Sequence, residues 1–129
     1  MRYVCLVYLD ATKLDDLADG ERTELRSAAS ACEDELRRSG YLVSAEPLSS
    51  VRAATTLRVR EGSQDSIDGP AVETGEQLHE VFVLEARDLN EAIRLAARHP
   101  GARLGGIEIR PVATGKAGTA GEDLRVVSP

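Results

Sequence analysis

The stretch DGPAVETGEQL, residues 68–78, leads into the apolar run VFVLEA, residues 81–86. Asp-Gly-Pro is typical of a tight turn, because proline fixes one backbone angle and glycine tolerates a positive φ. The apolar run has the length and composition of a buried strand. A polar stretch with hairpin character precedes the corner, so this part of the chain predicts a hairpin, a corner and a strand in that order.

The residues before the hairpin predict a strand, a helix and a second short strand. Residues 3–9 are apolar without interruption, which is typical of a strand with both faces covered. Apolar residues three and four apart predict an amphipathic helix that begins near Asp19 and stops at Gly40, with Glu33 on one of its polar faces. A short strand follows and is halted near Pro47.

The hairpin strand at residues 56–60 alternates in polarity, so Leu57 and Val59 are expected to be buried. After the apolar run, Asp88 predicts the start of a second helix, which ends at His99. An imidazolium there would suit the negative end of the helix dipole. Residues 104–112 then predict a last strand.

This order of elements predicts an α+β fold, a ferredoxin-like split βαβ sandwich with an added hairpin. Both helices would cover one face of an antiparallel sheet. The two fully apolar strands leave the other face too hydrophobic for water, so we expect a second copy of the chain to cover it. Residues 1–112 form the predicted domain. Residues 113–129 form a tail, either loosely ordered or pairing across the dimer through residues 124–127.

Composition limits the partners. The chain has 129 residues, the size of one domain, and a net charge of −6 without a cluster of Lys and Arg, which disfavours nucleic acid and anionic membranes. No apolar run is long enough to span a bilayer and no signal pattern is present, so we expect a cytoplasmic protein. Cys5 and Cys32 fall at apolar positions typical of unreactive thiols, with a disulfide or a nucleophile as the alternatives.

The string DGPAVETGEQL resembles the DGPF-type signature of the YCII-related family, and the neighbouring segments RYVCLVYLD, ATTLRVREG, LEARDLNEAIRLAARHP and IEIRPV follow in the expected order. The resemblance implies a homodimer of the α+β barrel type with a pocket in or beside the barrel. It also implies a catalytic His–Asp pair whose histidine lies in the first helix. Residues 10–39 contain no histidine, so this pair does not carry over. Ala71 and Gly75 replace the signature's phenylalanine and lysine.

Asp68 and His79 are the candidate catalytic pair. A carboxylate fixed by the Gly-Pro corner suits acid or base work, and an imidazole beside it would transfer protons near neutral pH. Alternatively, Asp68 accepts hydrogen bonds within its own turn and His79 is a surface residue. Glu73 and Tyr8 are the candidate substrate-binding residues. No set of His and Cys residues has metal-ligand spacing, so no metal site and no cofactor is expected.

Two functions follow. The first is a small dimeric enzyme that uses acid/base chemistry on a small molecule without a cofactor, with a lyase-like reaction suggested by family analogy. The alternative is a non-catalytic module that binds a metabolite or assists another protein.

Overall fold

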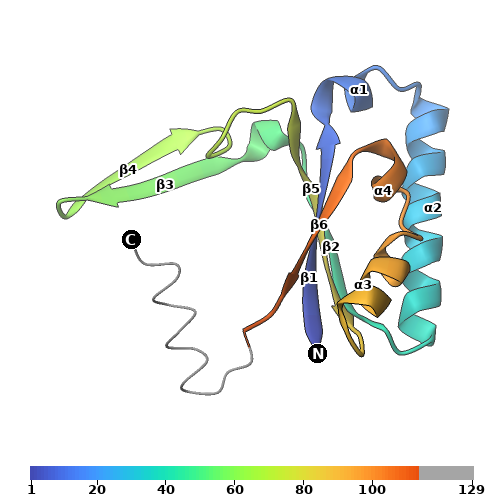
Figure 1. Ribbon diagram of the computed structural model, residues 1–129. Helices are drawn as coiled ribbons and strands as arrows, with labels where there is room; N and C mark the ends of the chain where they lie inside the picture. The colour runs from blue at the N-terminus through green and yellow to red at the C-terminus, as the bar shows by residue number, and fades with distance from the viewer. Residues whose placement is uncertain (114–129) are drawn as a thin grey trace.

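Four antiparallel strands form the central sheet of the computed structural model, which describes residues 1–113 (Figure 1). The strands are β1 (Arg2–Asp10), β2 (Leu42–Pro47), β5 (Glu76–Glu85) and β6 (Gly106–Pro111). Their spatial order is β2-β5-β1-β6, with β1 and β5 in the centre. This order and connectivity confirm the predicted α+β, ferredoxin-like arrangement.

The helices lie together on one side of this sheet (Figure 1). The long helix α2 (Asp19–Arg38) begins at Asp19 as predicted, and the amide of Ala18, the residue before it, donates to the Glu21 carboxylate at 3.2 Å. It ends at Arg38, and Gly40, two residues later, has a φ of 85°, which suits glycine. Helix α3 (Leu89–Ala96) begins as predicted, because Asp88 accepts a hydrogen bond from the Glu91 amide at 2.9 Å.

Two short helices were not predicted. The first is α1 (Ala11–Asp15), which follows β1 directly and is capped by Asp10, whose carboxylate accepts from the Thr12 amide at 2.9 Å. The second is α4 (Gly101–Leu104), which links the end of α3 to β6. Both helices lie at the same end of the sheet (Figure 1).

The core lies between the sheet and the helices. Alternate residues of the two central strands point into it and are almost fully buried, and they pack with Leu36 of α2. From β1 and β5 these residues are Tyr3, Cys5, Val7, Leu9, Phe82 and Leu84. Cys5 and Cys32 are both free thiols, and burial raises the pKa of Cys5 to about 12, as suits the predicted unreactive packing.

The hairpin forms a sheet of its own, made of β3 (Thr55–Arg60) and β4 (Ser63–Asp68), and it projects away from the central sheet (Figure 1). Within residues 1–113 these two strands pair only with each other. The predicted burial of Leu57 and Val59 is therefore wrong: they are 59% and 63% exposed. Alternating polar and apolar residues show that a strand has two different faces, but they do not show whether anything packs on either face.

A one-turn helix, η1 (Val51–Ala53), connects β2 to the hairpin. None of the helices within residues 1–113 is long and apolar enough to cross a membrane. The predicted pairing of residues 124–127 lies outside the described residues.

Candidate functional site

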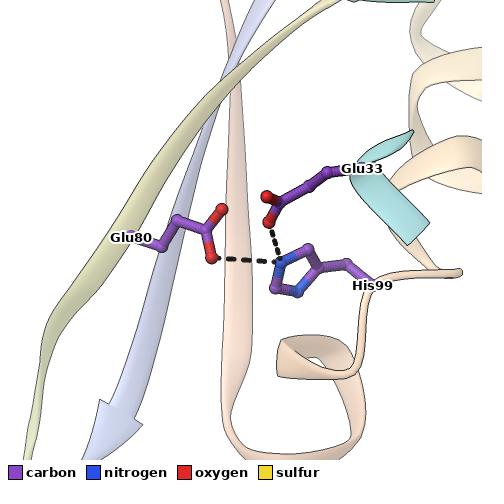
Figure 2. Close-up of side chains that lie close together, drawn as sticks. All are labelled: Glu33, Glu80 and His99. Carbon is purple, nitrogen blue, oxygen red and sulfur yellow. Dashed lines mark hydrogen bonds and ion pairs between the residues drawn. The ribbon is translucent and has the colours of Figure 1, made fainter. Parts of the chain in front are cut away.

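A cluster of ionisable side chains is buried between the sheet and the helices (Figure 2). His99, in the turn after α3, places Nε2 3.2 Å from Glu33 Oε2 and 3.2 Å from Glu80 Oε1. Glu33 projects from α2 and Glu80 from β5, so three separate elements meet at one imidazole nitrogen. The side chains are 9%, 1% and 4% exposed for Glu33, Glu80 and His99. We call these three residues the carboxylate–imidazole cluster.

Arg26 supplies the positive charge of this site. Its guanidinium donates to Glu33 Oε1 at 3.2 Å and lies 3.6 Å from Glu80 Oε1. Arg26 and Glu33 are seven residues apart on α2, which is two helical turns, so both side chains lie along one face of the helix. The second oxygen of Glu80, Oε2, is buried and has no hydrogen-bond partner within residues 1–113. Such an atom is costly to bury and is rare in folded proteins.

The position of the imidazole proton follows from the backbone. The Gly101 amide donates to His99 Nδ1 at 3.0 Å, so Nδ1 accepts and the ring proton is on Nε2, from which it is shared by the two carboxylates. Phe82 stacks on the ring, with the centroids 5.1 Å apart, and helps to hold its plane.

The two carboxyl groups have different proton affinities. Burial would raise the pKa of Glu33, but hydrogen bonds with His99 and Glu80 and the charge of Arg26 lower it to about 2. Burial raises the pKa of Glu80, and the neighbouring Glu33 adds to the rise, although the hydrogen bond with His99 opposes it. The two shifts therefore favour the ionised form of Glu33 and the carboxylic acid form of Glu80.

His99 is subject to opposing influences. Burial would lower its pKa, whereas the hydrogen bonds and charges of Glu33 and Glu80 raise it. In a doubly protonated ring, the Nδ1–H and the Gly101 N–H would be two donors facing each other, and this opposes the rise in the pKa of His99. The Gly101 N–H at Nδ1 therefore fixes the neutral ring with its proton on Nε2. His99 lies just after α3, near the predicted helix end, and its side chain is buried between the sheet and the helices.

The same three residues are the ones that could hold a metal ion, since their ligand atoms lie within 4.8 Å of one another. A metal-binding histidine presents a lone pair to the ion and usually donates through its other nitrogen. Here the Gly101 amide occupies Nδ1 and fixes the proton on Nε2, and Arg26 already contributes a positive charge. The donor set therefore fits shared protons better than a metal ion.

A cavity of about 190 Å³ opens beside the cluster. Glu80, His99 and Arg26 form part of its lining, together with His79. The rest of the wall is largely apolar and comes from β1 and from helices α1 and α2: Val7, Leu9, Leu14, Leu25 and Ala29. A ligand here would contact hydrocarbon on most sides and ionisable groups on one side.

The structure distributes the predicted site residues over different surfaces. His79 lines the cavity, and burial, followed by the charge of Arg26, lowers its pKa. Tyr8 lines a second hollow of about 610 Å³ beside the Asp-Gly-Pro corner, and Glu73 lines a third of about 390 Å³. Asp68 ends β4, opposite Thr55, and lines none of these three.

The structure does not bring the predicted catalytic pair into contact, because Asp68 and His79 share no hydrogen bond or ion pair among the described residues. Asp68 is exposed and belongs to the projecting hairpin, whereas His79 belongs to the central sheet. The roles of Asp68, Tyr8 and Glu73 stay predictions.

Sequence reasoning missed Glu33, Glu80 and His99 as a group. The predicted polar position of Glu33 is wrong: it follows buried Ala29 by four residues and precedes buried Leu36 by three, which is the spacing of one helix face. Likewise, Glu80 shares the strand alternation of Phe82. Both signals were present in the sequence, but no local pattern links either glutamate to the histidine.

Comparison with known proteins identifies the family. The model of the YCII-related domain matches residues 1–116. An uncharacterized protein of Rhizobium meliloti (strain 1021), R00369, is 31% identical over 120 residues, which cover 92% of this chain and 97% of that protein. The expected order of segments around the Asp-Gly-Pro corner agrees with this match. This chain therefore belongs to the YCII-related family.

Proposed function

We propose that the protein is a small acid/base enzyme that works without a cofactor, with the cavity beside the carboxylate–imidazole cluster as its small-molecule pocket and Glu80 as its proton-transfer group. One observation carries the proposal. Glu80 Oε2 is buried and unpartnered in a side chain that lines the cavity, while Oε1 of the same carboxyl is held by His99.

The surrounding residues support this role. His99 and Arg26 fix the orientation of the Glu80 carboxyl, so that only Oε2 is left for a ligand. Glu33 keeps the negative charge of the cluster next to Arg26, and this favours the protonated form of Glu80. A carboxyl whose pKa is raised holds its proton more tightly and is better suited to act as a general acid. Removal of a proton next to a carbonyl is a step that a lyase-like elimination would need.

A panel of compact metabolites tests the proposal. Ligands that raise the melting temperature are incubated with the protein and followed by NMR for chemical conversion. We expect conversion by the wild type and by Glu46→Gln, an exposed position on β2, and none by Glu80→Gln. A ligand that binds and stays unchanged would favour the alternative, a non-catalytic binding module.

We also infer that the protein is a homodimer, in which a second copy covers the open face of the central sheet. That face carries apolar side chains that the helices do not cover, and they are only half-buried: Val4, Leu6, Tyr8, Leu78, Val81 and Val83. Membership of the family supports a second copy as the occupant. Light scattering at micromolar concentration should give twice the 13.8 kDa chain mass, and Val83→Lys should give a folded monomer. A monomeric wild type would contradict the inference.

A further inference from the structure

An irregularity in β5 aims two consecutive side chains at the same cavity. Val7 of β1 pairs with Glu80 and the next residue, Tyr8, pairs with Leu78, so His79 has no partner in β1. This is a β-bulge, in which two residues oppose one and a side chain is re-aimed. Neighbouring residues of a regular strand point to opposite faces. Here His79 and Glu80 both line the cavity on the helix side of the sheet.

The two side chains have complementary proton states. Burial and the proximity of Glu33 favour the carboxylic acid form of Glu80, whose free Oε2 then offers a proton. Burial and the charge of Arg26 favour the neutral form of His79, which then offers a lone pair. A protonated acid and a neutral base therefore share one wall of the cavity. Pairs of groups whose environments separate their proton affinities mark acid and base roles.

The cavity limits the size and charge of what it binds. A dry cavity of about 150 Å³ accommodates benzene, so about 190 Å³ suits a ligand of roughly seven or eight non-hydrogen atoms. Both arginines of the lining are already engaged: Arg26 with Glu33 and Glu80, and Arg22 with the backbone carbonyls of Asp15 and Leu17. Asp15, the other charged residue of this wall, pairs with Arg52 at 3.4 Å, and the apolar side chains that make up most of the remaining wall favour an uncharged ligand.

We propose that the cavity binds a compact, uncharged carbonyl compound and enolises it between His79 and Glu80. His79 takes the proton from the carbon next to the carbonyl, and the C–H electron pair becomes the C=C bond. The carbonyl π pair moves to the oxygen, which takes the proton of Glu80 Oε2. The reverse step returns both protons, so atoms and charge balance without an oxidant or reductant. The inference deepens the proposed function and rests on it.

Exchange of the α-protons of cyclohexanone in deuterated, imidazole-free buffer, followed by NMR, is the test. This ketone has seven non-hydrogen atoms, carries no charge and has enolisable C–H bonds. We expect the wild type to accelerate exchange, and both Glu80→Gln and His79→Gln to reduce the protein-catalysed rate about a hundredfold or more, the scale of general acid–base catalysis. Glu46→Gln should exchange cyclohexanone at the wild-type rate. Thermal melts show that each variant is folded.

Phenol, which has the size of cyclohexanone and resembles its enol, distinguishes binding in the cavity from enolisation. It is used as a binding probe, followed by chemical-shift changes at His79 and Glu80. If phenol binds but exchange is not accelerated, the enolisation inference is overturned and the pocket of the proposed function stands. If phenol does not bind and exchange stays at the buffer rate, both are overturned. Acceleration that survives in His79→Gln would remove His79 as the base.

Discussion

Replacing Glu33 by glutamine removes the negative charge that Arg26 and His99 share inside the protein. The native carboxylate accepts from Arg26 at 3.2 Å and from His99 at 3.2 Å, and its side chain is only 9% exposed. Glutamine has almost the same shape, so the change tests charge rather than packing. Its amide oxygen can accept from only one of the two donors, so the N–H₂ group faces the N–H of either Arg26 or His99.

The magnitude follows from the pKa of Glu33, which falls from 4.5 to about 2 in the folded protein. At about 1.4 kcal/mol per unit, this shift corresponds to roughly 3 kcal/mol of stability. Arg26 is 40% exposed and its charge is partly screened by water, so we expect the loss in Glu33→Gln to be about 2 kcal/mol at pH 7. Asp34→Asn is the matched control, because Asp34 is the next residue, is 61% exposed and pairs with Arg37 at 3.2 Å. It should cost about 0.5 kcal/mol or less.

The pH dependence gives a second, independent readout. A carboxyl whose pKa is lowered by folding stabilises the protein above its unfolded pKa, and this stabilisation is lost as the pH falls through the folded value. The gap between wild type and Glu33→Gln should therefore be complete above about pH 5 and shrink by more than half at pH 3, between 4.5 and about 2. Urea unfolding at pH 7 and pH 3 measures both quantities. A Glu33→Gln protein as stable as Asp34→Asn at pH 7, or a gap that is equal at the two pH values, would refute the reasoning.

Three further predictions concern packing, thiol reactivity and metal. Gly105→Ala should destabilise the protein by about 2–3 kcal/mol in urea unfolding, because a Cβ there would overlap the Tyr8 carbonyl. Gly106→Ala is the control and should be nearly neutral, because there is open space around its Cα. Equal losses of stability in the two variants would contradict this prediction. Burial raises the pKa values of Cys5 and Cys32, so both thiols should react slowly with Ellman's reagent at pH 8 until the chain is unfolded. A rapid reaction of the native protein would contradict the buried packing of these thiols. Zinc in tenfold excess should shift the melting temperature by less than about 1 °C, because the carboxylate–imidazole cluster fits shared protons; a large, EDTA-reversible rise would show a metal site.

Local signals predicted the regular elements well. The cap of α3 could be predicted because Asp88 and Glu91 accept hydrogen bonds from amides within one turn, and such contacts depend only on neighbouring residues. The hairpin turn also depends on local residues, because Gly62, with a φ of 79°, adopts the backbone angle that the turn requires. The family resemblance likewise rested on contiguous residues around the Asp-Gly-Pro corner.

The residues of the candidate site could not be predicted as well from the sequence. The predicted partner of Asp68 was chosen along the chain, eleven residues away, yet the structure places His79 beside Glu80 and Arg26 instead. The irregular pairing that turns His79 toward the cavity depends on how β1 and β5 fit together, and the strand sequence alone suggests regular alternation. For Leu57 and Val59, alternation correctly predicted a common face, but nothing in the described chain covers that face.

By itself, the sequence determined the family, the order of the strands and the two longer helices, and the ferredoxin-like sheet. These follow from periodicity, caps and turns, whose energies arise between residues close in the chain. Only the tertiary structure decided that Glu33, Glu80 and His99 meet, because they are 47, 19 and 66 residues apart in their three pairings. Packing α2 and the turn after α3 against β5 removes water from three ionisable groups at once, and their proton affinities are set by that shared burial.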